Sequence, residues 1–181
     1  MEAIINAVSV IHKSRVFDLV REEVVLPNRV FVEMDIVRHP GAAAIVAMKD
    51  DSNLIMIEQY RHALGETIWE VPAGTLHKNE DPLDCARREL EEETGFTASS
   101  WDKLGVITPL PAYSDETIHV YLASDLSPSQ QNLDDDEILQ VTEISLPAAV
   151  DMIKEGKIKD GKTISSLFLA AIRLRVLEVA K

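Results

Sequence analysis

Short apolar runs separated by polar turns dominate the first part of the chain. Three segments rich in Val, Ile and Phe alternate apolar with polar residues (3–11, 15–25 and 29–37), and Leu26-Pro27-Asn28 forms a turn between the last two. Alternation of this kind is typical of strands in an antiparallel sheet. The pattern therefore predicts a small antiparallel β-sheet at the N-terminus, which ends at His39-Pro40-Gly41.

The rest of the chain predicts a larger mixed layer of strands and helices. Strands are expected at 42–48, 54–58, 67–71, 74–76, 102–108, 116–123 and 138–145, with those at 67–71 and 74–76 paired with each other. Helices are expected at 82–94, from Pro147 to about Gly156, and at 163–178. Many strands with three helices predict an α/β fold in which helices cover the faces of a mixed sheet. A domain boundary is expected near Arg38–Pro40, giving an N-terminal sheet (1–38) and a main domain (39–181).

Composition narrows the function classes. The 181 residues include 18 Lys and Arg against 31 Asp and Glu, a net charge of −13, which argues against nucleic acid or an anionic membrane as partner. The single Cys85 excludes an internal disulfide or a cysteine-based zinc site. The N-terminus has no secretory pattern, and the apolar run at 42–48 is far shorter than the ~20 residues of a membrane span. We expect a soluble cytoplasmic protein.

The helix expected at 82–94 concentrates acidic residues on one side. Asp81 is a suitable N-cap, Pro82 suits the first turn, and Gly95 suits the C-terminal stop. At 100° per residue, one stripe of the helix is expected to face the core: Leu83, Ala86, Leu90 and Thr94. Next to that stripe, three carboxylates share an arc of roughly 100°, with Arg88 beside one of them: Glu89, Glu92 and Glu93.

Three carboxylates this close repel one another unless a cation lies between them. Hard oxygen ligands in such an arrangement suit Mg²⁺ or Mn²⁺, which also bind substrate phosphate oxygens. A solvated acidic helix face is the plain alternative, and the surrounding sequence argues against it.

Residues 74–96 read GTLHKNEDPLDCARRELEEETGF. This segment resembles the signature of the Nudix hydrolases at every fixed position: Gly74, Glu80, Arg88, Glu89, Leu90, Glu92, Glu93, Gly95 and Phe96. The resemblance implies the Nudix α/β/α sandwich around a mixed sheet. It also implies metal-dependent hydrolysis of a nucleoside diphosphate linked to another group.

Flanking segments resemble the ADP-ribose pyrophosphatase and nucleoside-diphosphate-sugar branch of that family. They are Val37–Ala42, Glu58–Arg61, Trp69–Gly74 and Pro111. The resemblance implies hydrolysis of ADP-ribose or a related sugar nucleotide to a nucleoside monophosphate and a sugar phosphate. It also implies a homodimer formed through the N-terminal sheet. A preference for GDP-mannose, broad specificity, and a non-catalytic nucleotide sensor stay open as alternatives.

The same resemblance assigns metal ligands. Glu89 and Glu93 are expected to bind the metal, with Glu92 shared between metals and the Ala73 carbonyl as a further ligand. Arg88 belongs to the catalytic group in a structural role. Glu80 is either an outer ligand or an electrostatic contributor.

Residues outside the signature complete the expected site. The base is expected in the acidic loop 132–137, where Glu137 is the first choice and Asp136 the second. Three residues are candidates for substrate binding: Arg61, which contacts either the diphosphate or a strand-end carboxylate in a structural salt bridge, Glu70 for the base or ribose, and Arg38. Cys85 is expected to be a packed small residue.

Overall fold

The computed structural model describes residues 2–176 and divides the chain into two compact units. One unit comprises the chain up to Gly41 together with 108–117, and the other comprises 42–107 and the chain from Ile118 onward. Each unit is described separately below. Within 2–176, no helix has the length and apolar character needed to cross a membrane.

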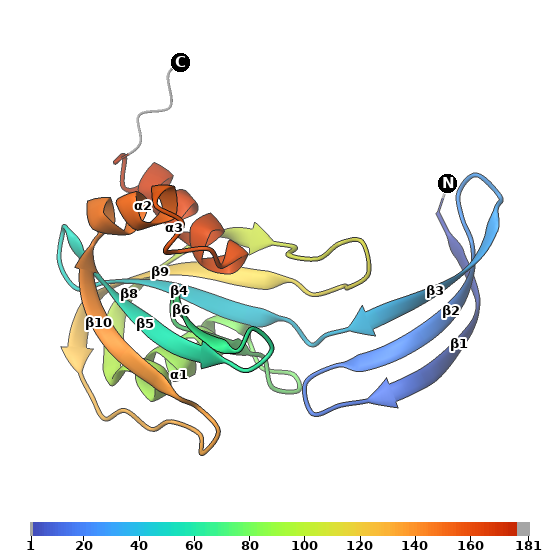
Figure 1. The fold of residues 1–181 in the computed structure, drawn as a ribbon, viewed down its shortest axis with the longest axis horizontal. Coiled ribbons are helices and arrows are strands. Elements are labelled where there is room, and N and C mark those ends of the chain that lie inside the picture. Colours follow the sequence, from blue (N-terminus) through green and yellow to red (C-terminus); the bar gives the residue numbers. More distant parts are fainter. Residues whose placement is uncertain (1, 177–181) are drawn as a thin grey trace. The chain divides into compact units, whose positions relative to one another are not determined.

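The N-terminal unit is the predicted antiparallel sheet. Its strands are β1 (Ile4–Lys13), β2 (Asp18–Val25) and β3 (Phe31–Arg38), in the order β1-β2-β3 (Figure 1). Segment 108–117 joins this unit, since Val37 N donates to Tyr113 O at 2.8 Å and Asp115 N donates to Val37 O at 3.2 Å. The sequence did not predict this second connection, because the segment is remote in the chain and has no strand pattern.

The strand register gives this sheet one apolar and one polar face. Residues opposite one another on neighbouring strands share a face, and the register aligns two rows of three with mostly apolar side chains: Val8, Glu22 and Met34, then Val10, Val20 and Ile36. The opposite face carries charged residues such as Arg21 and Asp35, paired at 2.7 Å. Every residue of β1 is exposed.

The second unit contains a seven-stranded mixed sheet. Its strands are β4 (Ala42–Met48), β5 (Asn53–Arg61), β6 (Glu66–Glu70), β7 (Ala73–Thr75), β8 (Phe96–Ile107), β9 (Ile118–Pro128) and β10 (Leu139–Ser145). The main order is β10-β5-β4-β9-β8, with β4 and β9 parallel and the other pairs antiparallel. Strand β4 is buried along its whole length, as its unbroken apolar run predicts.

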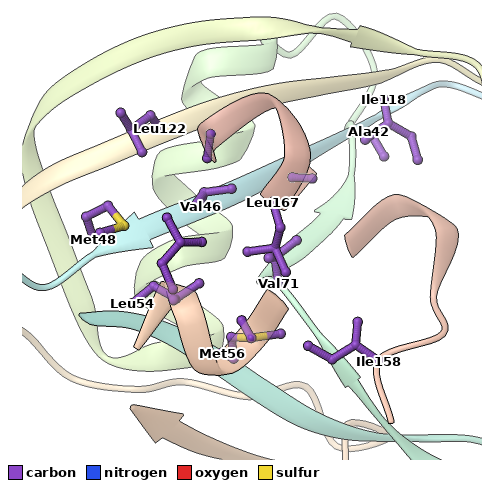
Figure 2. Packing of buried hydrophobic residues seen from close by; sticks show 14 residues of the cluster. Ala42, Val46, Met48, Leu54, Met56, Val71, Ile118, Leu122, Ile158 and Leu167 are labelled. Atoms are coloured by element: carbon purple, nitrogen blue, oxygen red, sulfur yellow. The ribbon is translucent and has the colours of Figure 1, made fainter. Parts of the chain in front are cut away.

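Helices cover both faces of this sheet and complete the predicted α/β/α arrangement. Helix α1 (Pro82–Thr94) packs on one face, against a cluster that includes Ala43 and Ile45. Helices α2 (Leu146–Lys154) and α3 (Gly161–Arg173) pack on the other face. Figure 2 shows Val46, Met56 and Leu167 gathered in that second core.

Three expectations about the elements need correction. Strands β6 and β7 exist but do not pair with each other: β6 pairs with β5, and β7 pairs with β4. The reason is that β4 and β5 pair only at Ala47–Ile55 and Met48–Leu54, so each has a free edge beyond that point. Strand β8 begins at Phe96, directly after α1. Helix α3 ends at Arg173, and the expected helical residues 177–178 lie outside the described part of the chain.

Candidate active site

Helix α1 begins and ends at the residues that its sequence predicts. The Asp81 carboxylate accepts a hydrogen bond from Leu83 N at 2.8 Å, and Pro82 occupies the first turn. Gly95 ends the helix in the left-handed conformation (φ 70°), and its N–H donates to Glu91 O at 2.9 Å. These caps fix the register of the helix and thereby the direction of its carboxylates.

The buried side of α1 is wider than predicted. Ala86 and Leu90 are fully buried as expected, but Cys85, Glu89 and Glu93 are buried as well. Glu89 and Glu93 therefore lie within the packed surface of the helix instead of next to it, whereas Glu92 stays partly exposed.

Glu89 and Glu93 are the two buried carboxylates of the helix, with 8% and 1% of their surface exposed. Burial raises the pKa of both, and the neighbouring Glu89 reinforces the effect at Glu93, whose pKa rises to about 8. Glu93 accepts one hydrogen bond, from Ala73 N at 2.9 Å. Two acidic groups thus share a site in which their negative charges are only partly compensated.

Arg88 binds three carboxylates of the signature. Its Nε donates to Glu80 Oε1 at 2.9 Å, and its Nη1 donates to Glu89 Oε1 at 2.6 Å and to Glu92 Oε2 at 3.0 Å. Nη2 donates to Glu80 Oε2 at 3.0 Å and to Thr75 O at 3.3 Å. A planar guanidinium with five donors suits this arrangement. The contacts fit the structural role expected for Arg88.

Glu80 is committed to two partners. Both of its oxygens accept hydrogen bonds from Arg88, and Oε2 also accepts one from His77 N at 2.7 Å. The bonds from Arg88 lower the pKa of Glu80 to about 2. Of the two roles left open for Glu80, this geometry favours the electrostatic one.

The described residues 2–176 contain no ready-made group of three metal-ligating side chains. Arg88 donates to Glu89 and Glu92, whereas Glu93 accepts from Ala73 N. The charge of Glu89 is among the causes that raise the pKa of Glu93.

The acidic loop before β10 is tied to α1. Gln131 Nε2 donates to Glu93 O at 2.6 Å, and Asn132 N donates to Glu92 O at 2.9 Å. A surface hollow of about 440 Å³ lies beside these contacts, lined by Arg88, Glu91, Glu92, Gln130 and Asn132. Asn132 begins the acidic loop expected from the sequence, whereas no sequence signal indicated Gln131, which precedes the loop and matches no motif.

Glu137 closes the acidic loop. Its Oε2 accepts a hydrogen bond from Asp134 N at 2.9 Å, and its own N–H donates to Asp134 O at 3.0 Å. The charge of Glu137 also contributes to the raised pKa values of Glu89 and Glu93, after burial and nearer groups. The charge of Glu137 thus disfavours ionisation of both buried carboxylates.

Arg61 and Glu70 pair with each other. Arg61 Nε donates to Glu70 Oε1 at 2.9 Å, and Nη2 donates to Oε2. Only 4% of the Glu70 side chain is exposed, whereas 40% of the Arg61 side chain is exposed. The second cation at Glu70 is Lys162 of α3. The sequence missed it, because the helix was expected to begin at residue 163.

Arg38 belongs to the N-terminal unit. Its Nη1 donates to Asp115 Oδ2 at 2.9 Å, and its Nη2 donates to the buried Glu22. Cys85 is fully buried, as expected for a packed small residue, and burial raises the pKa of its thiol to about 12.

The chain is similar in sequence to proteins of known name. The chain is 42% identical over 155 residues to an ADP-ribose pyrophosphatase of Bacillus subtilis (strain 168), with 84% of each chain covered. It is also 42% identical over 156 residues to a methanol dehydrogenase activator of Bacillus methanolicus, covering 85% of this chain and 84% of the relative.

A solved structure and a family model also match this chain. A crystal structure of an ADP compounds hydrolase has a TM-score of 0.84 and 24% identity, covering 97% of this chain and 96% of the other. This match shows a common fold. The model of the NUDIX domain matches residues 37–167, which is most of the chain and includes all of the signature. The chain therefore belongs to the NUDIX family.

Proposed function

We propose that this protein hydrolyses the pyrophosphate bond of ADP-ribose, giving a nucleoside monophosphate and a sugar phosphate. The observation that carries the proposal is the buried pair Glu89 and Glu93, whose raised pKa values reflect negative charge that the protein does not fully compensate. A relative 42% identical over most of both chains is named as an ADP-ribose pyrophosphatase, which supports this substrate.

The residues present fit a divalent cation such as Mg²⁺ or Mn²⁺. The donors are hard carboxylate oxygens, which suit these ions, and glycine at residue 74 leaves the space that the Glu89 carboxylate occupies. Glu89, Glu92, Glu93 and the Ala73 carbonyl would hold the ion. A bound cation supplies charge neutralisation on the phosphate oxygens and a lower pKa for an attacking water.

The remaining steps belong to side chains of the protein itself. Glu137 accepts the proton of the attacking water. The loop that carries it is bonded to α1 through Asn132 N and Glu92 O, and its charge acts on Glu89 and Glu93. Arg61 binds the diphosphate through the donors that Glu70 leaves free. Arg88 holds Glu80, Glu89 and Glu92 in place.

We further propose that residues 1–38 mediate a homodimer. The apolar face of the N-terminal sheet exposes side chains from β1 and β3, including Val8, Val10 and Met34. Contiguous exposed apolar surface of this kind is typical of protein interfaces. A second copy of the chain would cover it, while the polar face with Arg21 and Asp35 stays in water.

A hydrolysis panel with Mg²⁺ tests the substrate. It contains ADP-ribose, GDP-mannose, ADP-glucose, UDP-glucose and dinucleotides, with products identified for each. Dinucleotides are included because they contain the same diphosphate link. The expected result is the highest kcat/KM for ADP-ribose. Equal values across bases would instead indicate recognition of the sugar diphosphate, and no hydrolysis of any compound would contradict the proposal.

A further inference from the structure

The first turn of α3 is bonded to the connection between β6 and β7. Asp160 is the N-cap of the helix, and its Oδ2 accepts from Thr163 N at 2.9 Å and from Thr163 Oγ1 at 2.7 Å. Thr163 Oγ1 in turn accepts a hydrogen bond from Val71 N at 3.0 Å. Thr163 is fully buried. The start of α3 is therefore fixed to the chain segment that leads from Glu70 into the metal-ligating candidate Ala73.

Lys162 extends from this turn to Glu70. Its Nζ lies 3.3 Å from Glu70 Oε2, 3.2 Å from Asp160 Oδ2 and 3.5 Å from Val71 O. Only 13% of its side chain is exposed. A cation in the first turn of a helix is unfavourable to the helix dipole, so the position of Lys162 is explained by the carboxylates that it contacts.

Glu70 stands between two cations. Its side chain is almost completely buried. Both of its oxygens accept hydrogen bonds from Arg61, and Oε2 also contacts Lys162 Nζ. A buried carboxylate that loses one of two cations is left with uncompensated charge. Without Lys162, the Glu70 carboxylate is expected to rotate toward water or toward Arg61. Either rotation changes the direction of the Arg61 guanidinium.

We propose that Lys162 is a positioning residue for diphosphate recognition: through Glu70 it fixes the orientation of Arg61. This inference rests on the proposed function, in which Arg61 binds the diphosphate. The hydrogen bonds to Glu70 use Nε and Nη2 of Arg61, and Nη1 makes no hydrogen bond to any residue among 2–176. The Arg61 side chain is 40% exposed, so that a diphosphate can approach the donors that Glu70 leaves free.

Lys159 offers a matched control. It lies three residues before Lys162, and its Nζ contacts Glu66 Oε1 at 2.6 Å, but both side chains are about half exposed. Lys159→Met removes an ion pair from the same region without touching Glu70. Lys162→Met removes the buried positive charge, whereas Lys162→Arg keeps it.

The first test is a double-mutant cycle on the hydrolysis of ADP-ribose with Mg²⁺. Lys162→Met is expected to raise KM about tenfold, the factor that 1.4 kcal/mol represents, while kcat stays within about threefold. Lys162→Arg restores most of KM, and Lys159→Met has the wild-type value. The double variant with Arg61→Met and Lys162→Met is expected to have the same KM as Arg61→Met alone. Additive effects on KM, or a lower melting temperature with unchanged KM, would overturn the proposal.

A second readout does not need hydrolysis. Hydrogen exchange of Arg61 Nε–H, followed by ¹⁵N NMR of the substrate-free protein, reports the bond to Glu70 directly. Exchange in Lys162→Met is expected to be about tenfold faster than in the wild type, and unchanged in Lys159→Met. If Lys162→Met does not fold, Lys162→Gln takes its place with the same expectation. Wild-type exchange in the folded variant overturns the inference, whereas an inactive wild type overturns only the proposed function.

Discussion

The carboxylate of Glu89 occupies the space in which a side chain at residue 74 would lie. A Cβ placed on Gly74 would be 1.8 Å from Glu89 Oε1 and 1.9 Å from Glu89 Cδ. The backbone at Gly74 is not in the left-handed region that favours glycine. The absence of a side chain at this position therefore serves Glu89 and not the conformation of the chain.

Gly74→Ala is expected to disable the site while preserving the fold. The atoms that the new methyl group meets are the end of a flexible side chain, so Glu89 moves aside at little cost in stability. A ligand displaced by about 1 Å is expected to lower kcat by about 100-fold. Steady-state kinetics with ADP-ribose and Mg²⁺ measure kcat, and thermal unfolding measures stability.

Gly105→Ala is the matched control. Gly105 also lies in a strand, and its added Cβ would meet only Leu169 Cδ1 at 3.5 Å, an ordinary contact. It is expected to keep wild-type kcat and melting temperature. A Gly74→Ala enzyme with near-normal kcat would remove Glu89 from the set of metal ligands.

The pKa of Glu93 predicts how the stability of the metal-free protein depends on pH. Burial raises this pKa from 4.5 to about 8, so the folded state retains a proton that the unfolded state releases. Stability is therefore expected to fall as the pH rises from 4.5 to 8, by a few kcal/mol at about 1.4 kcal/mol per pKa unit. Urea unfolding in EDTA at several pH values within this window measures the slope.

Glu93→Gln separates the effect of the Glu93 charge on stability from its effect on turnover. The variant is expected to lose most of the pH dependence and to exceed the wild type in metal-free stability at pH 8, while its turnover falls by orders of magnitude. Asp84→Asn, on the exposed side of the same helix, is expected to behave like the wild type in both assays. Near-normal hydrolysis by Glu93→Gln would contradict the metal assignment.

Glu80 predicts the opposite dependence in acid. Hydrogen bonds from Arg88 lower its pKa from 4.5 to about 2, so the stability that it contributes is present above pH 4.5 and disappears as the pH falls toward 2. Glu80→Gln is expected to destabilise the protein by about 1–3 kcal/mol at neutral pH. The difference from the wild type should vanish near pH 2 in urea unfolding. Glu66→Gln, which removes an exposed pair with Lys159, is expected to cost less than about 1 kcal/mol.

Local signals made α1 predictable from the sequence. Its N-cap Asp81, its early proline and its terminal Gly95 act within one turn, so the caps need no knowledge of the rest of the fold. The spacing of Glu89, Glu92 and Glu93 on the helix is local for the same reason. The contact between Arg88 and Glu92 follows from their separation of four residues.

Features that depend on distant segments were not predictable in the same way. The burial of Glu93 depends on strands that pack against α1, and the pairing of β6 with β5 depends on where β4 and β5 separate. Lys162 contacts Glu70 across 92 positions in the chain. Periodicity reports the faces of one element, but it does not report which element will cover each face.

Glu137 is expected to influence turnover more than binding. As the proposed base it accepts a proton in the reaction, so Glu137→Gln should lower kcat by about 100-fold or more with little change in KM. Its hydrogen bond from Asp134 N is retained by the amide oxygen of glutamine, which limits disturbance of the loop. Steady-state kinetics across a range of pH measure both constants.

Asp136→Asn is the companion variant, because Asp136 is the second choice for the base. It is expected to keep kcat within about threefold of the wild type if Glu137 carries the proton. The reverse result, with normal kcat in Glu137→Gln and a large loss in Asp136→Asn, would transfer the role to Asp136.

The apolar face of the N-terminal sheet predicts that the protein is a dimer. Neighbouring residues of β1 lie on opposite faces of this sheet, so only one of them is expected to lie in the interface. Val8 lies opposite Glu22 on the apolar face, whereas the next residue, Ser9, lies opposite Arg21 on the polar face. Val8→Asp places a charge where the partner subunit is expected to pack, next to the buried carboxylate of Glu22. Ser9→Asp adds the same charge beside a cation in water.

Light scattering after gel filtration at micromolar concentration measures the mass of each protein. The wild type and Ser9→Asp are expected at the mass of two chains, and Val8→Asp at the mass of one, because a buried unpaired charge costs more than the apolar contacts around it contribute. The same added charge at two successive residues is thus expected to give a dimer in one variant and a monomer in the other. Neither general unfolding nor the change in total charge explains such a difference. A wild-type protein that is monomeric at this concentration would show that a different surface, or none, covers the apolar face.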